Sequence, residues 1–175
     1  MCGIVGYLGP KKGKGVLIDG LARLEYRGYD SAGMAVISED GSIHRDRAVG
    51  KVANLREKIE SSDWDGHVGI AHTRWATHGV PNETNTHPHA NSSETIFVVH
   101  NGIIENYQEL RKELESKDYT FVSDTDTEVL AHLIDWYTQI VNDFPEAVRQ
   151  ALKQTVGTYG VAVISKDHPG KLVAA

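Results

Sequence analysis

The sequence contains a single cysteine, Cys2, no long apolar run and no excess of basic residues. One cysteine cannot form an intramolecular disulfide, which excludes a disulfide-stapled fold and suits a reducing, cytoplasmic environment. No apolar run approaches the roughly 18 residues that a membrane-spanning helix needs. The polar residues at 10–12 follow the first apolar run too soon for a signal peptide. A net charge of −6 argues against a general nucleic-acid-binding protein.

The length of 175 residues, with 40% hydrophobic and 24% charged residues, is typical of one soluble globular domain. A chain of this length can bury a substantial core without disulfides. Its last five residues, 171–175, form a largely apolar run with no polar tail. Since domains rarely stop inside a core strand, we expect residues 1–175 to be one domain that is truncated before its end.

Hydrophobic periodicity predicts a mixed α+β fold. Apolar runs rich in β-branched residues predict strands at 3–8, 31–38, 68–72, 96–100, 160–165 and 172–174, and a weaker strand at 42–46. Helical patterns cover 16–24, 52–59, 107–114, 129–140 and 145–154. Thr125 and Glu128 have the spacing of a capping box for the fourth helix. This order favours sheets covered by helices over a regular βαβ winding, and residues 73–95 form the longest irregular stretch.

Cys2 has two interpretations. Free cysteine is often buried, and the sequence CGIVG at residues 2–6 is typical of a core strand. Alternatively, removal of Met1 would leave an N-terminal cysteine whose α-amine, with a pKa of about 8, can serve as the general base for its own thiol. The residue type and position alone leave both interpretations open.

Four histidines and an arginine lie in or beside the irregular stretch. Arg74 can hold a carboxylate through two N–H donors, or it can be a surface residue packed on Trp75. The histidines also suggest a metal site, although they lack a helical His-x-x-x-His pair and acidic ligands. They are His72, His78, His87 and His89.

Two polar groups follow predicted elements further along the chain. The Asn101-Gly102 pair follows a strand, where it is typical of a tight hairpin turn. It can also form an oxyanion hole from the Asn101 side-chain amide and the Gly102 backbone N–H. Asp126 can cap a helix, or it can hold an ammonium group if Thr125 or Thr127 supplies the cap.

Taken together, six stretches of the chain resemble one family. They are residues 2–6 (CGIVG), 26–33 (YRGYDSAG), 72–79 (HTRWATHG), 87–89 (HPH), 100–102 (HNG) and 123–128 (SDTDTE). In this order they resemble the N-terminal glutaminase domain of the glucosamine-6-phosphate synthase family (glutamine–fructose-6-phosphate aminotransferases). These are class II glutamine amidotransferases and N-terminal nucleophile hydrolases. The resemblance implies a four-layer α/β/β/α sandwich that is C-terminally incomplete here, with the sugar-isomerase domains absent.

The resemblance also implies roles for individual residues. It implies that Cys2 is the nucleophile and that Asn101 and Gly102 form the oxyanion hole. The other residues are implied to bind glutamine or to support the site: Arg74 for the α-carboxylate, Asp126 for the α-ammonium group, Trp75, Thr77, His78 and His87 as pocket lining, and Arg27 as a supporting residue.

The implied reaction is hydrolysis of glutamine to glutamate and ammonia through a cysteine thioester, without a metal or other cofactor. In full-length members of the family, a C-terminal isomerase domain uses the ammonia to aminate fructose 6-phosphate, and a homodimer is expected. Three alternatives remain: a purine-pathway phosphoribosyl amidotransferase, a catalytically silent fragment, and a metal-dependent hydrolase built on the histidines.

Overall fold

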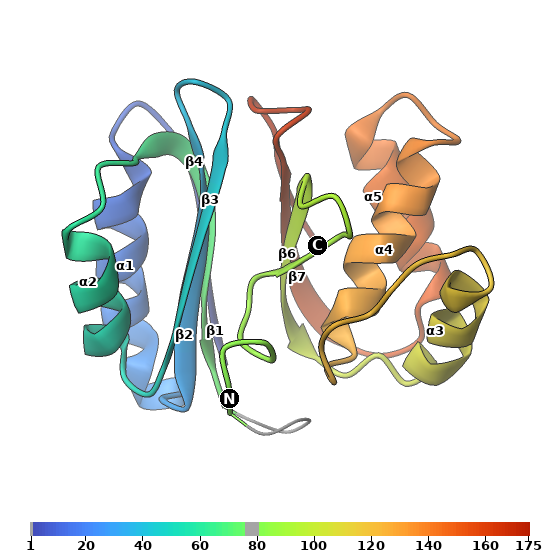
Figure 1. Cartoon of the computed structure of the whole chain (residues 1–175), viewed down its shortest axis with the longest axis horizontal. Helices are drawn as coiled ribbons and strands as arrows, with labels where there is room; N and C mark the ends of the chain where they lie inside the picture. Colours follow the sequence, from blue (N-terminus) through green and yellow to red (C-terminus); the bar gives the residue numbers. More distant parts are fainter. Residues whose placement is uncertain (1, 76–80) are drawn as a thin grey trace.

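Two four-stranded sheets stack face to face in this computed structural model, which describes residues 2–75 and 81–175 (Figure 1). All strand pairs are antiparallel. The first sheet has the order β1 (Gly3–Leu8), β4 (Gly66–Arg74), β2 (Ser31–Ser38), β3 (Ile43–Val49). The second has the order β5 (His89–Ala90), β6 (Ile96–Gly102), β7 (Tyr159–Ser165), β8 (Leu172–Ala174).

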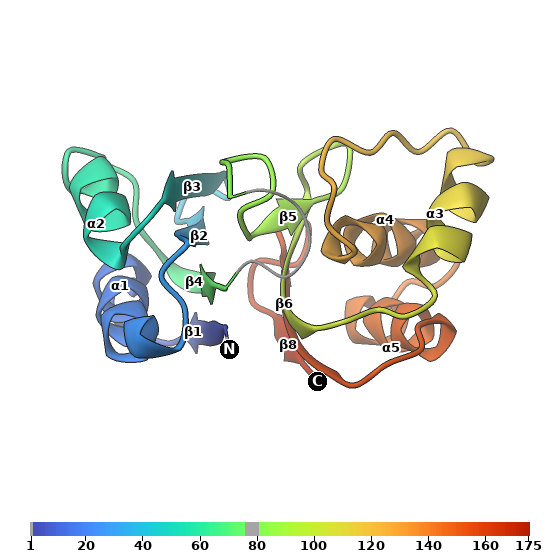
Figure 2. The same ribbon diagram turned by 90° about the horizontal axis from the view of Figure 1, so that it is seen from below.

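Helices cover the outer face of each sheet, which confirms the predicted four-layer α/β/β/α sandwich (Figure 2). The first sheet carries α1 (Gly13–Leu24) and α2 (Val52–Glu60), and a short 3-10 helix, η1 (Glu25–Arg27), follows α1. The second sheet carries α3 (Tyr107–Glu115), α4 (Thr127–Thr138) and α5 (Phe144–Gln154). In the part of the chain that the structure describes, no helix is long and apolar enough to cross a membrane.

The strands are apolar on both faces because each sheet is buried on both sides. Successive side chains of a strand point to opposite faces. In β2, Val36 packs with the residues of α1 and α2, whereas Ile37 faces the second sheet. In β6, Val98 packs under α4 and α5, whereas Val99 faces the first sheet. One apolar layer between the sheets thus joins the two halves.

This inner layer becomes polar at one end of the sandwich. In β4, the inward-facing series continues from the fully buried Ile70 to His72 and Arg74. In β6, the inward-facing series continues from Val99 to Asn101. Because the same period of two that builds the core also aims these side chains inward, the polar groups of both sheets meet between the layers.

The predicted helices and strands agree with the observed elements to within a few residues. Two short elements are not predicted from the sequence: η1, and β5, which is only two residues long and lies in the irregular stretch. The predicted capping box is wrong: Asp126 occupies the N-cap position of α4, and its side chain makes no capping bond. Glu128 instead accepts hydrogen bonds from the backbone N–H groups of Val122 and Ser123, at 2.9 and 2.7 Å. The carboxylate therefore reaches further back along the chain than a capping box requires.

Gly33 provides a test of how tightly the layers are packed. A Cβ atom at this inward-facing position would lie 2.1 Å from the backbone oxygen of His87. Gly33→Ala is expected to destabilise the fold by about 1–3 kcal/mol, because the backbone on both sides must move. At the exposed helical Gly15, an added Cβ atom would have no neighbour within 4 Å, so Gly15→Ala is the matched control.

Gly15→Ala is expected to stabilise the protein by about 0.5–1 kcal/mol, because alanine favours the helix. Urea unfolding of the two variants and the unchanged chain measures both effects. Equal stability of the two variants would contradict the close approach at Gly33.

Candidate active site

Cys2 lies directly before β1, at the polar end of the inner layer. Its side chain is half-buried, and the backbone N–H of Trp75 donates to Sγ at 3.2 Å. Sγ also lies 3.7 Å from the backbone oxygen of Trp75. An N–H group aimed at sulfur stabilises negative charge on that atom. The antiparallel pairing of β1 with β4 brings the two residues together, since Gly3 pairs with Thr73.

The Asn101 side chain joins the two sheets beside Cys2. Its Nδ2 donates to the backbone oxygen of Cys2 at 3.0 Å, and its Oδ1 lies 2.8 Å from Nε2 of His72. Gly102 follows with φ of +144°, a conformation that favours glycine. A Cβ atom there would lie 2.5 Å from Cβ of Tyr159. Asn101 and Gly102 are the last two residues of β6 and pair with Gly160 and Tyr159 of β7. They do not form a tight hairpin turn, so the hairpin interpretation is wrong.

A cavity of about 30 Å³ opens beside Cys2. Six of the predicted site residues line it: Cys2, Arg74, Trp75, His87, Gly102 and Asp126. The cavity is also lined by His100, Thr125 and Thr127, which the sequence alone does not mark as site residues. Arg27, which lies in η1, and Asn101, which contacts Cys2 and His72, are not among the lining residues. Thr77 and His78 lie outside the described residues.

Two charged side chains of opposite sign lie on the cavity wall. Arg74 is buried, with 4% of its surface exposed. Burial lowers the pKa of Arg74, and the nearby carboxylates of Asp30 and Asp126 oppose this shift. Asp126 is also buried, and its Oδ2 accepts the backbone N–H of Ile104 at 2.8 Å. This bond ties one carboxylate oxygen of Asp126 to Ile104, on the loop that follows Asn101 and Gly102.

Three of the buried histidines form a chain of contacts beside the cavity. The rings of His72 and His87 stack with centroids 4.1 Å apart. Nε2 of His87 and Nδ1 of His100 lie 2.9 and 3.0 Å from Oγ1 of Thr127. Burial lowers the pKa of His72 to about 4 and lowers the pKa values of His87 and His100. All three rings are therefore neutral at pH 7. Within residues 2–75 and 81–175, no three His, Cys, Asp or Glu side chains are grouped as metal ligands.

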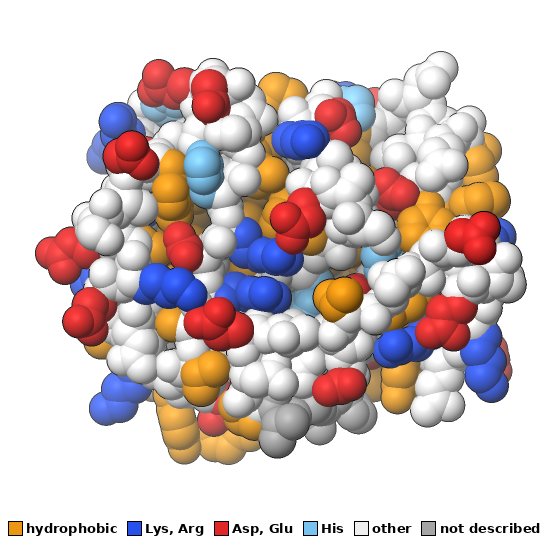
Figure 3. Space-filling view, viewed as in Figure 1, with side chains coloured by type: hydrophobic (Ala, Val, Ile, Leu, Met, Phe, Trp, Pro, Cys, Tyr) orange, Lys and Arg blue, Asp and Glu red, His pale blue; other side chains and the backbone are white. Residues whose placement is uncertain are grey.

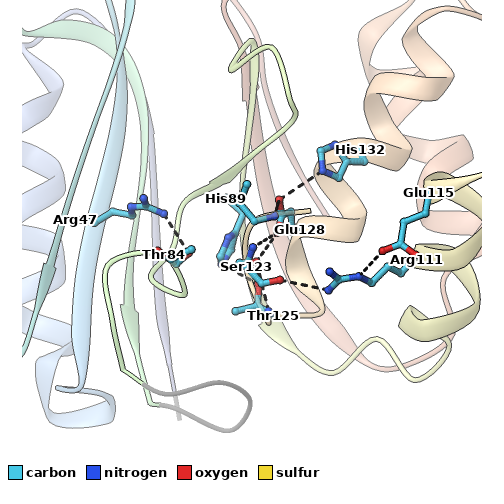
Figure 4. Close-up of polar contacts among 10 residues, drawn as sticks. Arg47, Thr84, His89, Arg111, Glu115, Ser123, Thr125, Glu128 and His132 are labelled. Carbon is cyan, nitrogen blue, oxygen red and sulfur yellow. Dashed lines mark hydrogen bonds and ion pairs between the residues drawn. The ribbon is translucent and has the colours of Figure 1, made fainter. Parts of the chain in front are cut away.

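A second polar network fixes the loop that carries Asp126. In Figure 4, Glu128 points toward Ser123 and His132, and Ser123 lies beside Thr125. Ser123 Oγ donates to Glu128 at 2.6 Å, and Thr125 Oγ1 lies 3.0 Å from His89 Nε2. Burial raises the pKa of Glu128, but the nearby His132 ring, at 3.5 Å, and hydrogen bonds from Ser123 and Val122 outweigh this effect and bring it to about 2. The loop is thus anchored by a buried carboxylate that stays charged.

A larger cavity of about 290 Å³ lies away from Cys2, lined by Arg45, Arg47, His89 and Glu128 among others. Figure 3 shows positive side chains gathered at the middle of the face that is viewed there. Arg45 is paired with Glu94 at 2.5 Å, and the second negative side chain in the wall is Glu128. The charges of this cavity therefore balance within the protein. The smaller cavity, which holds the cysteine, is the better candidate for catalysis.

Two solved structures share this fold. The glutamine phosphoribosylpyrophosphate amidotransferase from B. subtilis matches with a TM-score of 0.78 and 24% sequence identity, over 95% of this chain and 35% of that one. An allosteric regulatory enzyme of purine biosynthesis matches with a TM-score of 0.79, also at 24% identity, over 95% of this chain and 36% of that one. The chain therefore shares the fold of these two enzymes.

Sequence similarity supports a more specific assignment. A family model described as "Glutamine amidotransferase domain" matches residues 72–175, so the chain belongs to this family. Curated relatives named glutamine–fructose-6-phosphate aminotransferase (isomerizing) are 54% identical in Haemophilus influenzae and 52% identical in Escherichia coli, over 100% of this chain. The relative from Clostridium perfringens is 53% identical over 99% of the chain. The chain spans 28% of the length of each of these three relatives.

The buried histidines predict a loss of stability in mild acid. The pKa values of His72 and His89 are about 4 and about 3 in the folded protein, and burial also lowers that of His87. Histidine pKa values in the unfolded chain are near 6.5. Between this pH and the lowered pKa values of the folded protein, the unfolded chain therefore binds more protons than the folded protein does. The free energy of unfolding should therefore fall as the pH drops below about 6.5, by up to about 4 kcal/mol per pH unit for three such rings.

Urea unfolding at pH 7, 6, 5 and 4.5 measures this slope. His89→Gln removes one of the three rings, so its slope below pH 6 should be shallower than that of the unchanged chain. A free energy of unfolding that stays constant from pH 6.5 to 5 would contradict the burial of neutral rings.

Proposed function

We propose that residues 1–175 form one glutaminase domain, which hydrolyses the side-chain amide of glutamine to glutamate and ammonia through a thioester on Cys2. The observation that carries the proposal is that four groups suited to this chemistry lie at or beside Cys2. A backbone N–H points at Sγ, the Asn101 amide lies against the same residue, and Arg74 and Asp126 line the adjoining cavity. No cofactor is required for this chemistry.

The nucleophile needs a base, because a free thiol is only a few per cent ionised at pH 7. Removal of Met1 would expose the α-amine of Cys2, which takes the thiol proton directly or through a water molecule. The thiolate then attacks the amide carbon of glutamine, and the carbonyl oxygen becomes an oxyanion. The intermediate collapses as the amide nitrogen takes a proton and leaves as ammonia. Water then attacks the thioester, releases glutamate and restores the thiol.

The oxyanion would be stabilised by the second N–H of Asn101 Nδ2 and by the backbone N–H of Gly102. The first N–H of the Asn101 amide already donates to the Cys2 oxygen, and an amide nitrogen has two. Donors of this kind are each worth about 3–4 kcal/mol of transition-state stabilisation.

Free glutamine would be recognised through both of its charged ends. Arg74 would bind the α-carboxylate and Asp126 the α-ammonium group, which requires an amino acid rather than a peptide-bonded residue. Trp75 and His87 line the same cavity. Since the cavity of about 30 Å³ has room for only one or two water molecules, the lining side chains must separate to admit glutamine.

Three further assignments remain parts of the proposal. Thr77 and His78 would complete the pocket lining, and Arg27, half-buried in η1, would support the site from beyond the cavity wall.

In a full-length protein like the curated relatives, ammonia would pass to a C-terminal isomerase domain and aminate fructose 6-phosphate. Such a protein would be a cytoplasmic homodimer. The identity of about 50% with relatives of this name favours the sugar-aminating type over the purine type, whose representatives share 24%.

The nucleophile assignment predicts that Cys2→Ala abolishes glutamate release from glutamine. No other thiol exists in the chain, so none can replace it. A chain that retains Met1 should also be inactive, because its Cys2 nitrogen is then an amide and a poor base.

Enzyme-coupled glutamate detection on preparations of known intact mass measures both effects. Activity in Cys2→Ala would exclude the nucleophile, whereas full activity with Met1 retained would exclude only the amine base. Inactivity of the Met1-free chain would indicate a silent fragment.

The ammonium-binding role predicts that Asp126→Asn lowers kcat/KM for glutamine by about 10- to 150-fold, mainly by raising KM, because a charged hydrogen bond is lost. The matched control is Asp124→Asn, two residues away on the same loop. Asp124 is exposed and bonds to Asn85 rather than to the cavity. Steady-state kinetics of both variants checks the prediction, and similar values for Asp126→Asn and Asp124→Asn would contradict it.

A further inference from the structure

The Asn101 amide has only one orientation that its surroundings permit. The backbone oxygen of Cys2 can only accept a hydrogen bond, so the amide atom 3.0 Å from it must be the donor Nδ2. The amide oxygen Oδ1 therefore faces His72, at 2.8 Å from Nε2. Since an amide oxygen can only accept, Nε2 of His72 must carry the proton.

The surroundings of His72 agree with this tautomer. The ring is 1% exposed, and its other nitrogen, Nδ1, has no hydrogen-bond partner among the described residues. An unprotonated Nδ1 leaves only an acceptor unpaired, whereas a proton there would leave a buried donor unpaired. Burial holds the ring neutral, with a pKa of about 4. Nδ1 is therefore free of a proton at pH 7.

The ring itself is held on two sides. His72 belongs to β4, where Ile4 and Gly33 are its neighbours in the adjoining strands. The ring of His87 stacks on it at 4.1 Å, and Thr127 in turn binds His87. His72 is not among the residues that line the cavity, and its ring contacts Asn101 and His87 instead.

We propose that His72 is a positioning residue, which holds the Asn101 amide so that Nδ2 faces Cys2 and the developing oxyanion. Without the Nε2–H donor, only the Cys2 backbone oxygen orients the amide, so the N–H groups of Nδ2 are held less firmly toward the oxyanion. This inference rests on the proposed glutaminase function. It predicts a loss of turnover rather than of glutamine binding, because Arg74 and Asp126 are left in place.

The test compares His72→Phe, His72→Gln, Asn101→Ala and the double variant His72→Phe/Asn101→Ala. Phenylalanine keeps a ring to stack on His87 but lacks the donor, and the glutamine amide can supply an N–H near the position of Nε2. His72→Phe should lower kcat by about tenfold or more, since small misplacements of a catalytic group cost up to about 100-fold. Its KM for glutamine should stay within about twofold of the original value. His72→Gln should recover much of the loss, and the double variant should be no slower than Asn101→Ala.

The rate at which iodoacetamide alkylates Cys2 separates a loss of positioning from a general disruption of the fold, because only disruption of the fold would change it. That reaction forms no oxyanion, so its rate in His72→Phe should match that of the unchanged chain. Unchanged kcat in His72→Phe, a parallel loss of alkylation, or losses that multiply in the double variant would each overturn the positioning role while leaving the proposed function in place. Absence of glutamate release by the unchanged, Met1-free chain would overturn both.

Nitrogen-15 NMR of the imidazole rings tests the same inference without any variant that has to fold. The His72 ring should show a protonated Nε2 and an unprotonated Nδ1 at pH 7. The opposite tautomer would overturn the inference, because Nε2 could then not donate to Asn101.

Discussion

The apolar contact between the two sheets is the constraint on which the rest of the structure depends. Ile70 of β4 and Val99 of β6 belong to this single buried cluster, which fixes the register of one sheet against the other. Each strand then continues by two residues, to His72 and to Asn101, and the period of two keeps these side chains in the space between the sheets. The polar site is therefore an extension of the core pattern, and the geometry at Cys2 is only as accurate as the packing behind it.

Much of the fold could be predicted because its elements follow local rules. Hydrophobic runs placed the strands, and Pro145 lies in the first turn of α5 as its type favours. The capping box failed because Glu128 has better partners upstream, in the backbone of Val122 and Ser123. Tertiary contacts of this kind override a spacing rule that considers only four residues. The two-residue strand β5 is likewise defined by its partner β6 rather than by its own sequence.

The candidate site could be predicted only in part from residue types. Cys2, Arg74 and Asp126 each have an ordinary structural interpretation, and only the resemblance to a family linked them before the fold was known. The fold places all three on one cavity. The sequence itself suggests His72 only as a metal ligand, because its contact with Asn101 joins residues 29 positions apart on different sheets. No local pattern encodes such a pair, whereas the alternation in β4 and β6 does aim both side chains inward.

The central claim is that Cys2 attacks glutamine at this cavity and carries the acyl group. The most direct measurement is intact mass spectrometry of the Met1-free chain, quenched in acid within the first turnovers with glutamine. The account predicts a fraction of chains heavier by one γ-glutamyl group, with peptide mapping that assigns the group to Cys2 and hydroxylamine that removes it. Glutamate release without any adduct on Cys2, or an adduct on another residue, would contradict the account.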